Sequence, residues 1–375
     1  MTVERPGDAR RYAALPNPFP MQRGGELPNA RIAYETWGSL NAACDNSLLL
    51  FTGLSPSAHA ASSPLDPSPG WWEAMVGPGL AVDTRRWFVV CVNSLGSCFG
   101  STGPASIKPG GGLPWRLEFP ELSVEDIARA GFETLRSLGI SQTAVVAGAS
   151  LGGMAVLAFA ALFPGGARRL ISVSGTAAAS PLAIALRSVQ REAILRDPAW
   201  LAGAYALAQP PRNGMRIARK LGTITYRSAL EWNERFGRDA IVRGKTNATG
   251  RAGPFAPEFA IEGYLETLAE KFAGSFDANC YLYLSRAMDR FNLAQHDANI
   301  RDVFLRAQLQ AALIIGVQTD MLFPIGEQAD LASALRDSGV STTFAPLVCR
   351  EGHDAFLVDT AAFTAPIREF LAAAP

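Results

Sequence analysis

Residues 148–153 read Gly-Ala-Ser-Leu-Gly-Gly, and this stretch decides the fold because of what lies on either side of it. The short apolar run of residues 144–147 predicts a buried strand, and residues 154–163 are rich in helix formers. A strand, a sharp turn and a helix are the context that a G-x-S-x-G nucleophile elbow requires. The flanking glycines let the helix pack close to the strand. Ser150 is therefore the predicted nucleophile; the alternative is a chance match in a chain with 35 glycines.

A serine nucleophile needs a base, and the chain has three histidines. In proteins built on this elbow, the acid and the base follow the serine on late loops at the carboxyl edge of the sheet. His59 precedes the serine, and no strand precedes His296. His353 follows the strand-like residues 342–348 and precedes an apolar terminal helix. His353 is therefore the predicted base, and the alternative is an exposed loop histidine.

The acid is expected where the preceding strand ends. Residues 311–317 form a continuous apolar run, as in a strand that is covered on both faces, and the run leads to Asp320. Asp330 and Asp337 are weaker candidates because their surroundings look helical and solvated. Asp320 is therefore predicted to orient and stabilise the imidazolium of His353, with a strand-end cap as the alternative.

The composition is that of a soluble enzyme. With 375 residues and 48% hydrophobic residues the chain can bury a large core, and 34 basic residues balance 34 acidic ones. The first residues lack the apolar core of a signal peptide, and the longest apolar run is too short to span a bilayer. The five cysteines are scattered, without metal-ligand spacing. We expect a cytoplasmic protein with reduced thiols, no metal, and no nucleic-acid or membrane partner.

The order of the predicted elements divides the chain into three parts. Residues 1–175 alternate strands and helices, which predicts an α/β fold with a mainly parallel sheet and flanking helices. Helical segments dominate residues 176–304, and residues 305–375 carry the predicted acid and base. The helical insertion between the two halves is expected to form a lid over the site.

A second loop is expected to complete the oxyanion hole. Gly53, Leu54, Ser55 and Pro56 end a predicted strand, at the place where the second oxyanion-hole N–H of such proteins arises. The backbone N–H groups of Leu54 and Leu151 are the predicted pair of donors. The alternative is an ordinary turn rich in glycine, proline and serine.

Several motifs, in order along the chain, together resemble the homoserine O-acyltransferase family of the α/β-hydrolase fold. They are residues 70–72, 77–79, 93–104, 150–154, 224–228 and 352–357. Members of this family move an acyl group from acyl-CoA to the hydroxyl of a small amino acid. The resemblance implies a homodimeric acyltransferase with Ser150, Asp320 and His353 as its triad. It also implies Arg219 and Asp354 as substrate contacts, the arginine for a carboxylate and the aspartate for an ammonium.

Three departures from the usual homoserine pattern look like the serine O-succinyltransferase branch of this family. Many homoserine enzymes have Ala-Leu-Ser-Gly in place of residues 53–56, so this loop is expected to select the substrate. Met321 and Leu322 follow the predicted acid where succinylating relatives tend to carry Trp-Arg. Arg187 replaces the asparagine that is usual in acetylating relatives, and it is expected to set acyl-CoA specificity by pairing with the succinyl carboxylate.

The resemblance thus implies transfer of a succinyl group from succinyl-CoA to L-serine through a succinyl-Ser150 intermediate. Succinyl-CoA is the co-substrate, no resident cofactor is expected, and the product would be O-succinyl-L-serine for cysteine biosynthesis. A homoserine O-acetyltransferase or O-succinyltransferase of methionine biosynthesis is the first alternative. An esterase or thioesterase would use the same triad, and a non-catalytic binding protein would be expected to lack one of its members.

Overall fold

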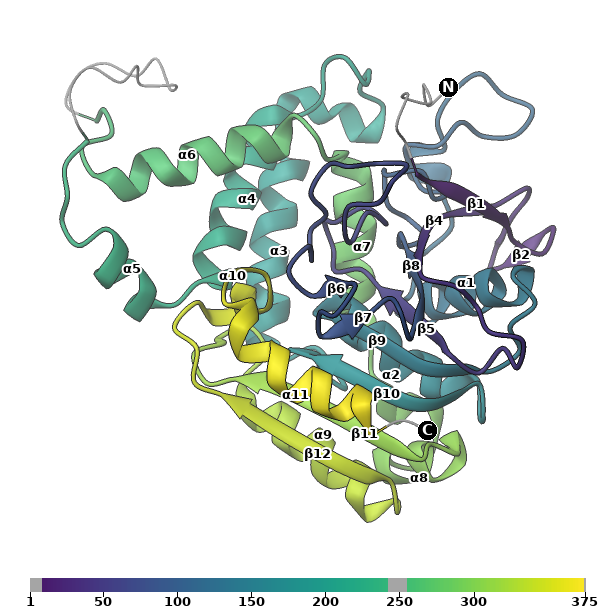
Figure 1. The fold of residues 1–375 in the computed structure, drawn as a ribbon. Helices are drawn as coiled ribbons and strands as arrows, with labels where there is room; N and C mark the ends of the chain where they lie inside the picture. Colours follow the sequence, from purple (N-terminus) through teal and green to yellow (C-terminus); the bar gives the residue numbers. More distant parts are fainter. Residues whose placement is uncertain (1–8, 242–254, 374–375) are drawn as a thin grey trace.

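The computed structural model describes residues 9–241 and 255–373 (Figure 1). Within these residues an eight-stranded sheet has the strand order β1-β4-β8-β5-β9-β10-β11-β12. Its strands are β1 (Arg11–Ala14), β4 (Arg31–Trp37), β5 (Ser47–Phe51), β8 (Phe88–Val92), β9 (Thr143–Ala149), β10 (Ala167–Val173), β11 (Ala311–Val317) and β12 (Ser341–Leu347). The pairs β1–β4 and β4–β8 are antiparallel, and the other neighbouring pairs are parallel. The predicted α/β fold with a mainly parallel sheet is confirmed.

Two small sheets lie outside the central one. They pair β2 (Phe19–Pro20) with β3 (Glu26–Leu27) and β6 (Val76–Gly77) with β7 (Val82–Asp83). Strands this short leave no periodic pattern in a sequence, so none of the four was predicted.

Side chains of alternate residues in the central strands enter two separate hydrophobic cores. Along β5, Leu49 and Phe51 enter one core, while Leu48 and Leu50 enter the other. The first core is covered by α1 (Val124–Ser137), α2 (Leu151–Leu162), α8 (Ile300–Ala307) and α9 (Ile325–Asp337), and the second by α11 (Thr360–Ala372). Strands buried on both faces explain why β5, β9 and β11 read as continuous apolar runs.

Between β10 and β11 the described residues form helices joined by loops, with no strand of the central sheet. The helices before α8 are α3 (Pro181–Leu195), α4 (Arg212–Tyr226), α5 (Ala229–Arg235), α6 (Ala260–Ala273) and α7 (Ala278–Arg290). α3 packs against α4 and α7, and α4 packs against α6 and against the turn at residues 352–354. In Figure 1 these teal and green helices gather beyond one end of the strands, so the insertion stands over a single edge of the sheet.

Two glycines allow α2 to approach the sheet closely. A Cβ atom on Gly148 would lie 2.4 Å from the carbonyl oxygen of Gly152, and one on Gly152 would lie 2.4 Å from that of Phe51. Both obstacles are backbone atoms, which cannot rotate away as the end of a side chain can.

Gly148→Ala is therefore expected to lower the free energy of unfolding by about 1–3 kcal/mol, because the elbow must open to admit the methyl group. Denaturant unfolding followed by circular dichroism measures this loss. Gly326→Ala in α9 is the matched control, since a Cβ atom there meets nothing within 4 Å and should not destabilise the protein. Equal unfolding midpoints for the two variants would contradict the prediction.

Candidate active site

Ser150 occupies a strained turn between β9 and α2. Its backbone has φ 56° and ψ −120°, a combination that L-residues rarely adopt. The Ser150 N–H donates to the carbonyl oxygen of Val173 at 2.9 Å, which ties the turn to the end of β10. The geometry is that of a nucleophile elbow, with the serine at the N-terminal end of α2.

The structure brings the three predicted triad residues together. His353 Nε2 lies 2.8 Å from Ser150 Oγ, and His353 Nδ1 lies 2.7 Å from Asp320 Oδ2. The other oxygen of Asp320 accepts the backbone N–H groups of Leu322 and Phe323, each at 2.9 Å. Both Asp320 and His353 are buried, so the carboxylate is held in one orientation and can orient the imidazole.

Electrostatics favour a charged imidazole at this position. Burial lowers the pKa of His353, but the charge of Asp320, its hydrogen bond and the charge of Asp354 outweigh burial, and the pKa is raised above its ordinary value. The positive charge of Arg187 opposes this rise. The site therefore stabilises the imidazolium that forms when His353 accepts a proton from Ser150.

The loop at residues 53–56 begins beside the elbow. Phe51 at the end of β5 pairs with Gly148 of β9, and a Cβ atom on Gly53 would lie 3.7 Å from the Ala149 carbonyl oxygen. Within the described residues the N–H groups of Leu54 and Leu151 have no hydrogen-bond acceptor. These two donors, predicted from the sequence, are thus free to bind an oxyanion.

Sequence reasoning missed one residue that fixes this loop. Asn93 follows β8, and its side-chain nitrogen donates to the carbonyl oxygen of Pro56 at 3.1 Å. The same nitrogen lies 3.2 Å from the hydroxyl of Ser97. The signal was the polar loop at residues 93–104, but the sequence alone does not show which of its side chains reaches residues 53–56.

Arg187 is buried in α3 and is not a surface residue of its helix. Only 4% of it is exposed, and its Nε lies 2.6 Å from Asp289 Oδ1. Within the described residues, Nη1 and Nη2 have no hydrogen-bond partner. The charge of Arg187 acts on both His353 and Tyr226, so the guanidinium lies within electrostatic reach of the triad.

Arg219 and Asp354 place opposite charges near the same tyrosine. The Arg219 guanidinium lies over the rings of Phe272 and Tyr226, 4.6 and 5.8 Å from their centres, and its Nε has no hydrogen-bond partner among the described residues. Asp354 Oδ2 lies 3.5 Å from Arg227 Nε, and burial raises the pKa of this carboxyl group.

Tyr226 and Arg227 were not predicted as site residues, although both belong to the motif at residues 224–228. The ring of Tyr226 lies 5.7 Å from that of His353. The arrangement can hold a zwitterion, with one cation and one anion close to the base.

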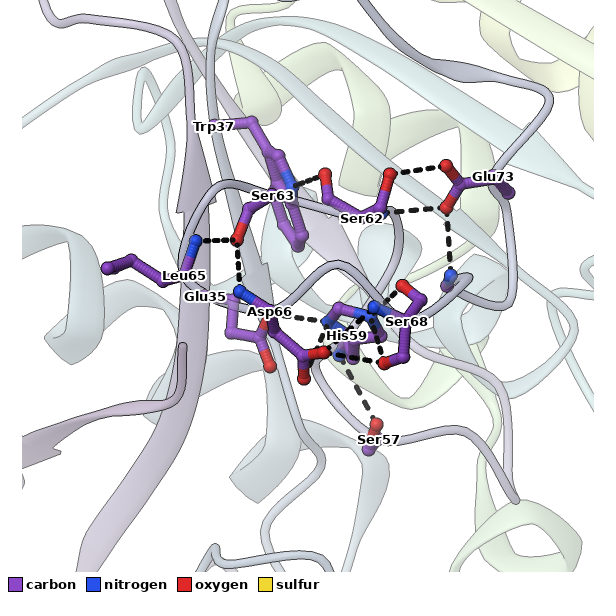
Figure 2. A network of polar contacts seen from close by, with 11 residues as sticks. Glu35, Trp37, Ser57, His59, Ser62, Ser63, Leu65, Asp66, Ser68 and Glu73 are labelled. Atoms are coloured by element: carbon purple, nitrogen blue, oxygen red, sulfur yellow. Dashed lines mark hydrogen bonds and ion pairs between the residues drawn. The ribbon is translucent and has the colours of Figure 1, made fainter. Parts of the chain in front are cut away.

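The two histidines that were set aside as bases are bound elsewhere. Figure 2 shows His59 between β4 and its own loop, with Nδ1 2.8 Å from Glu35 Oε2 and Nε2 2.8 Å from the Ser68 carbonyl oxygen. His296 Nε2 lies 3.0 Å from Glu125 Oε1. Both side chains are engaged in structural pairs.

One cluster outside the triad has the residue types of a metal site. Ligand atoms of Cys349, Glu351 and Asp359 lie within 4.8 Å of one another. Burial and the neighbouring Asp359 raise the pKa of the Cys349 thiol to about 12. The thiol therefore keeps its proton near neutral pH and donates it to the carboxylate of Asp359.

Comparison with known proteins agrees with this geometry. Residues 46–344 match the family model described as alpha/beta hydrolase fold. A serine O-succinyltransferase from Litchfieldella anticariensis is 55% identical over 366 residues, which cover 97% of this chain and 99% of the relative. The chain belongs to the homoserine O-acyltransferase family of the α/β-hydrolase fold. The resemblance predicted from the sequence is confirmed.

Two other matches show how the activities vary among similar proteins. An L-serine/homoserine O-acetyltransferase from Streptomyces lavendulae is 54% identical over 367 residues, 97% of each chain. The crystal structure of esterase E22 superimposes with a TM-score of 0.85 at 30% identity, covering 96% of this chain and 99% of the esterase. Proteins named as a transferase and as an esterase thus share this fold, and the fold alone does not separate the two activities.

The raised pKa of His353 predicts the acid limb of the pH profile. Only neutral His353 accepts a proton, so kcat/KM for the acyl donor should rise with pH through a midpoint above 6.5. Asp320→Asn removes the charge that raises this pKa while burial remains, so the midpoint should move to lower pH. The rate should also fall, by on the order of 10⁴-fold.

Single-turnover acylation across pH measures both effects. Asp330→Asn in α9 is the control, because Asp330 lies outside the hydrogen bonds of the triad. An Asp320→Asn variant with an unmoved midpoint would show that Asp320 does not set the pKa of the base.

Proposed function

We propose that the protein is a serine O-succinyltransferase, which moves the succinyl group of succinyl-CoA onto the hydroxyl of L-serine. The observation that carries the proposal is Arg187, a buried cation within electrostatic reach of the Ser150–His353 pair. Its two Nη groups have no hydrogen-bond partner in the part of the chain that the structure describes. A neutral acetyl group has no charge that could pair with these Nη groups. The terminal carboxylate of a succinyl group has one. The name of the Litchfieldella relative supports the same activity.

The first half-reaction transfers the acyl group to the protein. His353 Nε2 takes the proton of Ser150 Oγ as this oxygen attacks the thioester carbonyl carbon of succinyl-CoA. The N–H groups of Leu54 and Leu151 stabilise the oxyanion of the tetrahedral intermediate. The carbon–sulfur bond then breaks, His353 returns the proton to the leaving CoA sulfur, and a succinyl ester remains on Ser150.

The second half-reaction repeats these steps with the acceptor. His353 deprotonates the hydroxyl of L-serine, which attacks the ester carbonyl, and the proton returns to Ser150 Oγ as O-succinyl-L-serine leaves. Arg219 would hold the carboxylate of L-serine and Asp354 its ammonium. The triad and the oxyanion hole supply the nucleophile, base and charge stabilisation, so we propose no metal and no resident cofactor.

The loop at residues 53–56 would select the length of the acceptor. Serine and homoserine differ by one methylene, which a pocket discriminates by only about 1–3 kcal/mol. The position of this loop would therefore decide whether the hydroxyl of serine or that of homoserine reaches the acyl carbon. Asn93 fixes the loop through its hydrogen bond to the carbonyl oxygen of Pro56.

We further propose that the insertion of residues 176–304, between core parts 1–175 and 305–375, acts as a lid that keeps water from the acyl-enzyme. Exposed apolar residues on α3 and α4, among them Leu182, Val189, Ile217 and Ile224, would form the interface of a homodimer. None of the helices in the described part of the chain is long and apolar enough to cross a bilayer. A cytoplasmic location would suit a biosynthetic enzyme that uses acyl-CoA.

Serine or homoserine O-acetyl transfer is the second candidate, because the Streptomyces relative with that printed name is almost as similar as the succinyltransferase. This candidate has the same triad and the same acyl-enzyme chemistry. It differs in the donor, and an acetyl group would leave Nη1 and Nη2 of Arg187 without a partner among the described residues.

The function is tested by incubation with succinyl-CoA alone. Because acylation does not need the acceptor, the wild type should accumulate a succinyl ester on Ser150, visible by intact-protein mass spectrometry after rapid quench. Ser150→Ala should show no ester and no transfer. L-Serine should then discharge the ester to O-succinyl-L-serine faster than L-homoserine does, and hydrolysis that no amino acid affects would instead identify a thioesterase.

The variant Arg187→Asn tests whether succinyl-CoA is the acyl donor. A charge-assisted contact contributes roughly 1.5–3 kcal/mol, so kcat/KM for succinyl-CoA should fall by about tenfold or more. The use of acetyl-CoA should be spared or improved. Arg196→Asn is the control on the same segment, since the Arg196 side chain is 80% exposed. An equal loss with both donors would make Arg187 a structural residue, and a wild type that prefers acetyl-CoA would overturn the succinyl assignment.

A further inference from the structure

A single carboxylate on α7 lies between two arginines of α3. Asp289 Oδ1 lies 2.6 Å from Arg187 Nε, and its Oδ2 lies 2.6 Å from Arg191 Nη2. Arg191 Nη1 also donates to the hydroxyl of Ser285 at 2.9 Å. The exposed fractions of the three charged side chains are 5% for Arg187, 10% for Arg191 and 3% for Asp289.

The charges of this cluster do not balance. Two guanidinium groups share one carboxylate, so one positive charge is left over in a buried place, where an unpaired ion is costly. Arg191 is held on two sides, by Asp289 and by Ser285. The unbalanced positive charge is therefore assigned to Arg187, whose Nη1 and Nη2 have no hydrogen-bond partner in the described part of the chain.

The position of Asp289 decides which edge of Arg187 remains free. A guanidinium can meet a carboxylate along its Nε edge or across its two Nη groups. Asp289 occupies the Nε position, so a substrate carboxylate can bind only across Nη1 and Nη2. The second oxygen of Asp289 forms an ion pair with Arg191 Nη2, although without hydrogen-bond geometry, and this pair opposes a turn of the carboxylate toward the free edge.

We infer that Asp289 is a positioning residue for the acyl donor. It fixes the Arg187 guanidinium so that the Nη edge receives a terminal carboxylate at the distance that leaves the acyl carbonyl at Ser150. Asp289 touches neither substrate nor triad in this role, and it acts through Arg187. The inference rests on the proposed use of succinyl-CoA and adds a determinant of donor selection that lies in α7.

Removing the carboxylate should impair orientation more than binding. In Asp289→Asn the two arginines lack their shared anion, while the amide still fills its place. The Arg187 guanidinium is then held less firmly, and the succinyl carboxylate can draw it out of position. The donor would still bind, but its carbonyl would be drawn away from Ser150, and misplacement of this kind slows chemistry.

The experiment measures the rate of Ser150 acylation at saturating donor, by rapid quench and mass spectrometry. Succinyl-CoA is compared with butyryl-CoA, which has four acyl carbons and no carboxylate. In Asp289→Asn the maximal rate with succinyl-CoA should fall by about tenfold, and the rate with butyryl-CoA should change by less than about threefold. The KM for succinyl-CoA should not rise.

Glu266→Gln is the matched control. Glu266 of α6 pairs with two cations of α4, Arg216 and Lys220. Like Asp289, it is a buried carboxylate that lies between two cations. Its loss should destabilise the insertion without changing the succinyl-to-butyryl ratio. If Asp289→Asn does not fold, Ser285→Ala is the milder variant, because it removes one of the two contacts that hold Arg191. It should lower the ratio of the acylation rates with succinyl-CoA and butyryl-CoA by about threefold.

The possible results separate the two proposals. Equal losses with both donors, or an unchanged ratio in a folded variant, would overturn the role of Asp289. A wild type that is acylated no faster by succinyl-CoA than by butyryl-CoA would instead overturn the proposed donor, whatever Asp289 does. A lower ratio in Asp289→Asn with an unchanged ratio in Glu266→Gln supports the inference.

Discussion

The strained backbone of Ser150 is the constraint on which the rest of the structure depends. A φ of 56° at a non-glycine residue persists only when its surroundings hold it, and here β10 and the closely packed α2 do so. The close packing in turn needs glycine at positions 148 and 152. Since β5 and β11 run parallel to β9 and β10, the ends of these strands deliver the loop of Leu54 and the acid Asp320 to the same edge.

The core and the insertion contribute different things to the site. The core provides the reacting groups, Ser150, His353 and Asp320, which are held by short hydrogen bonds and by burial. The insertion provides cations, Arg187 from α3 and Arg219 from α4, which have atoms without hydrogen-bond partners among the described residues. Under the proposed roles of these arginines, the charges that select a substrate lie on helices outside the sheet, so one triad can serve different substrates on this fold.

The sequence predicted the sheet, and the three residues that it predicted as a triad lie together in the structure. It predicted the partners of the buried charges poorly. The strand at residues 311–317 was predicted to the residue, because burial on both faces imposes an apolar run. The three triad residues were predicted from their order along the chain, serine before acid before histidine, because parallel strands bring their carboxyl ends to the same edge. Arg187 came only from the family resemblance. Asp289 was not predicted, because no local pattern links two residues on different helices whose contact depends on packing.

The hydrogen bond between Ser150 and His353 joins residues that are 203 positions apart in the chain. A ribosome therefore completes the elbow long before it makes the base, and the whole helical insertion emerges between them. During that interval the outer side of β10 has no strand beside it, because its partner there is β11. An unpaired strand edge invites association with other chains. The same separation that places the helical insertion between Ser150 and His353 exposes the nascent chain to aggregation until the last two strands are added.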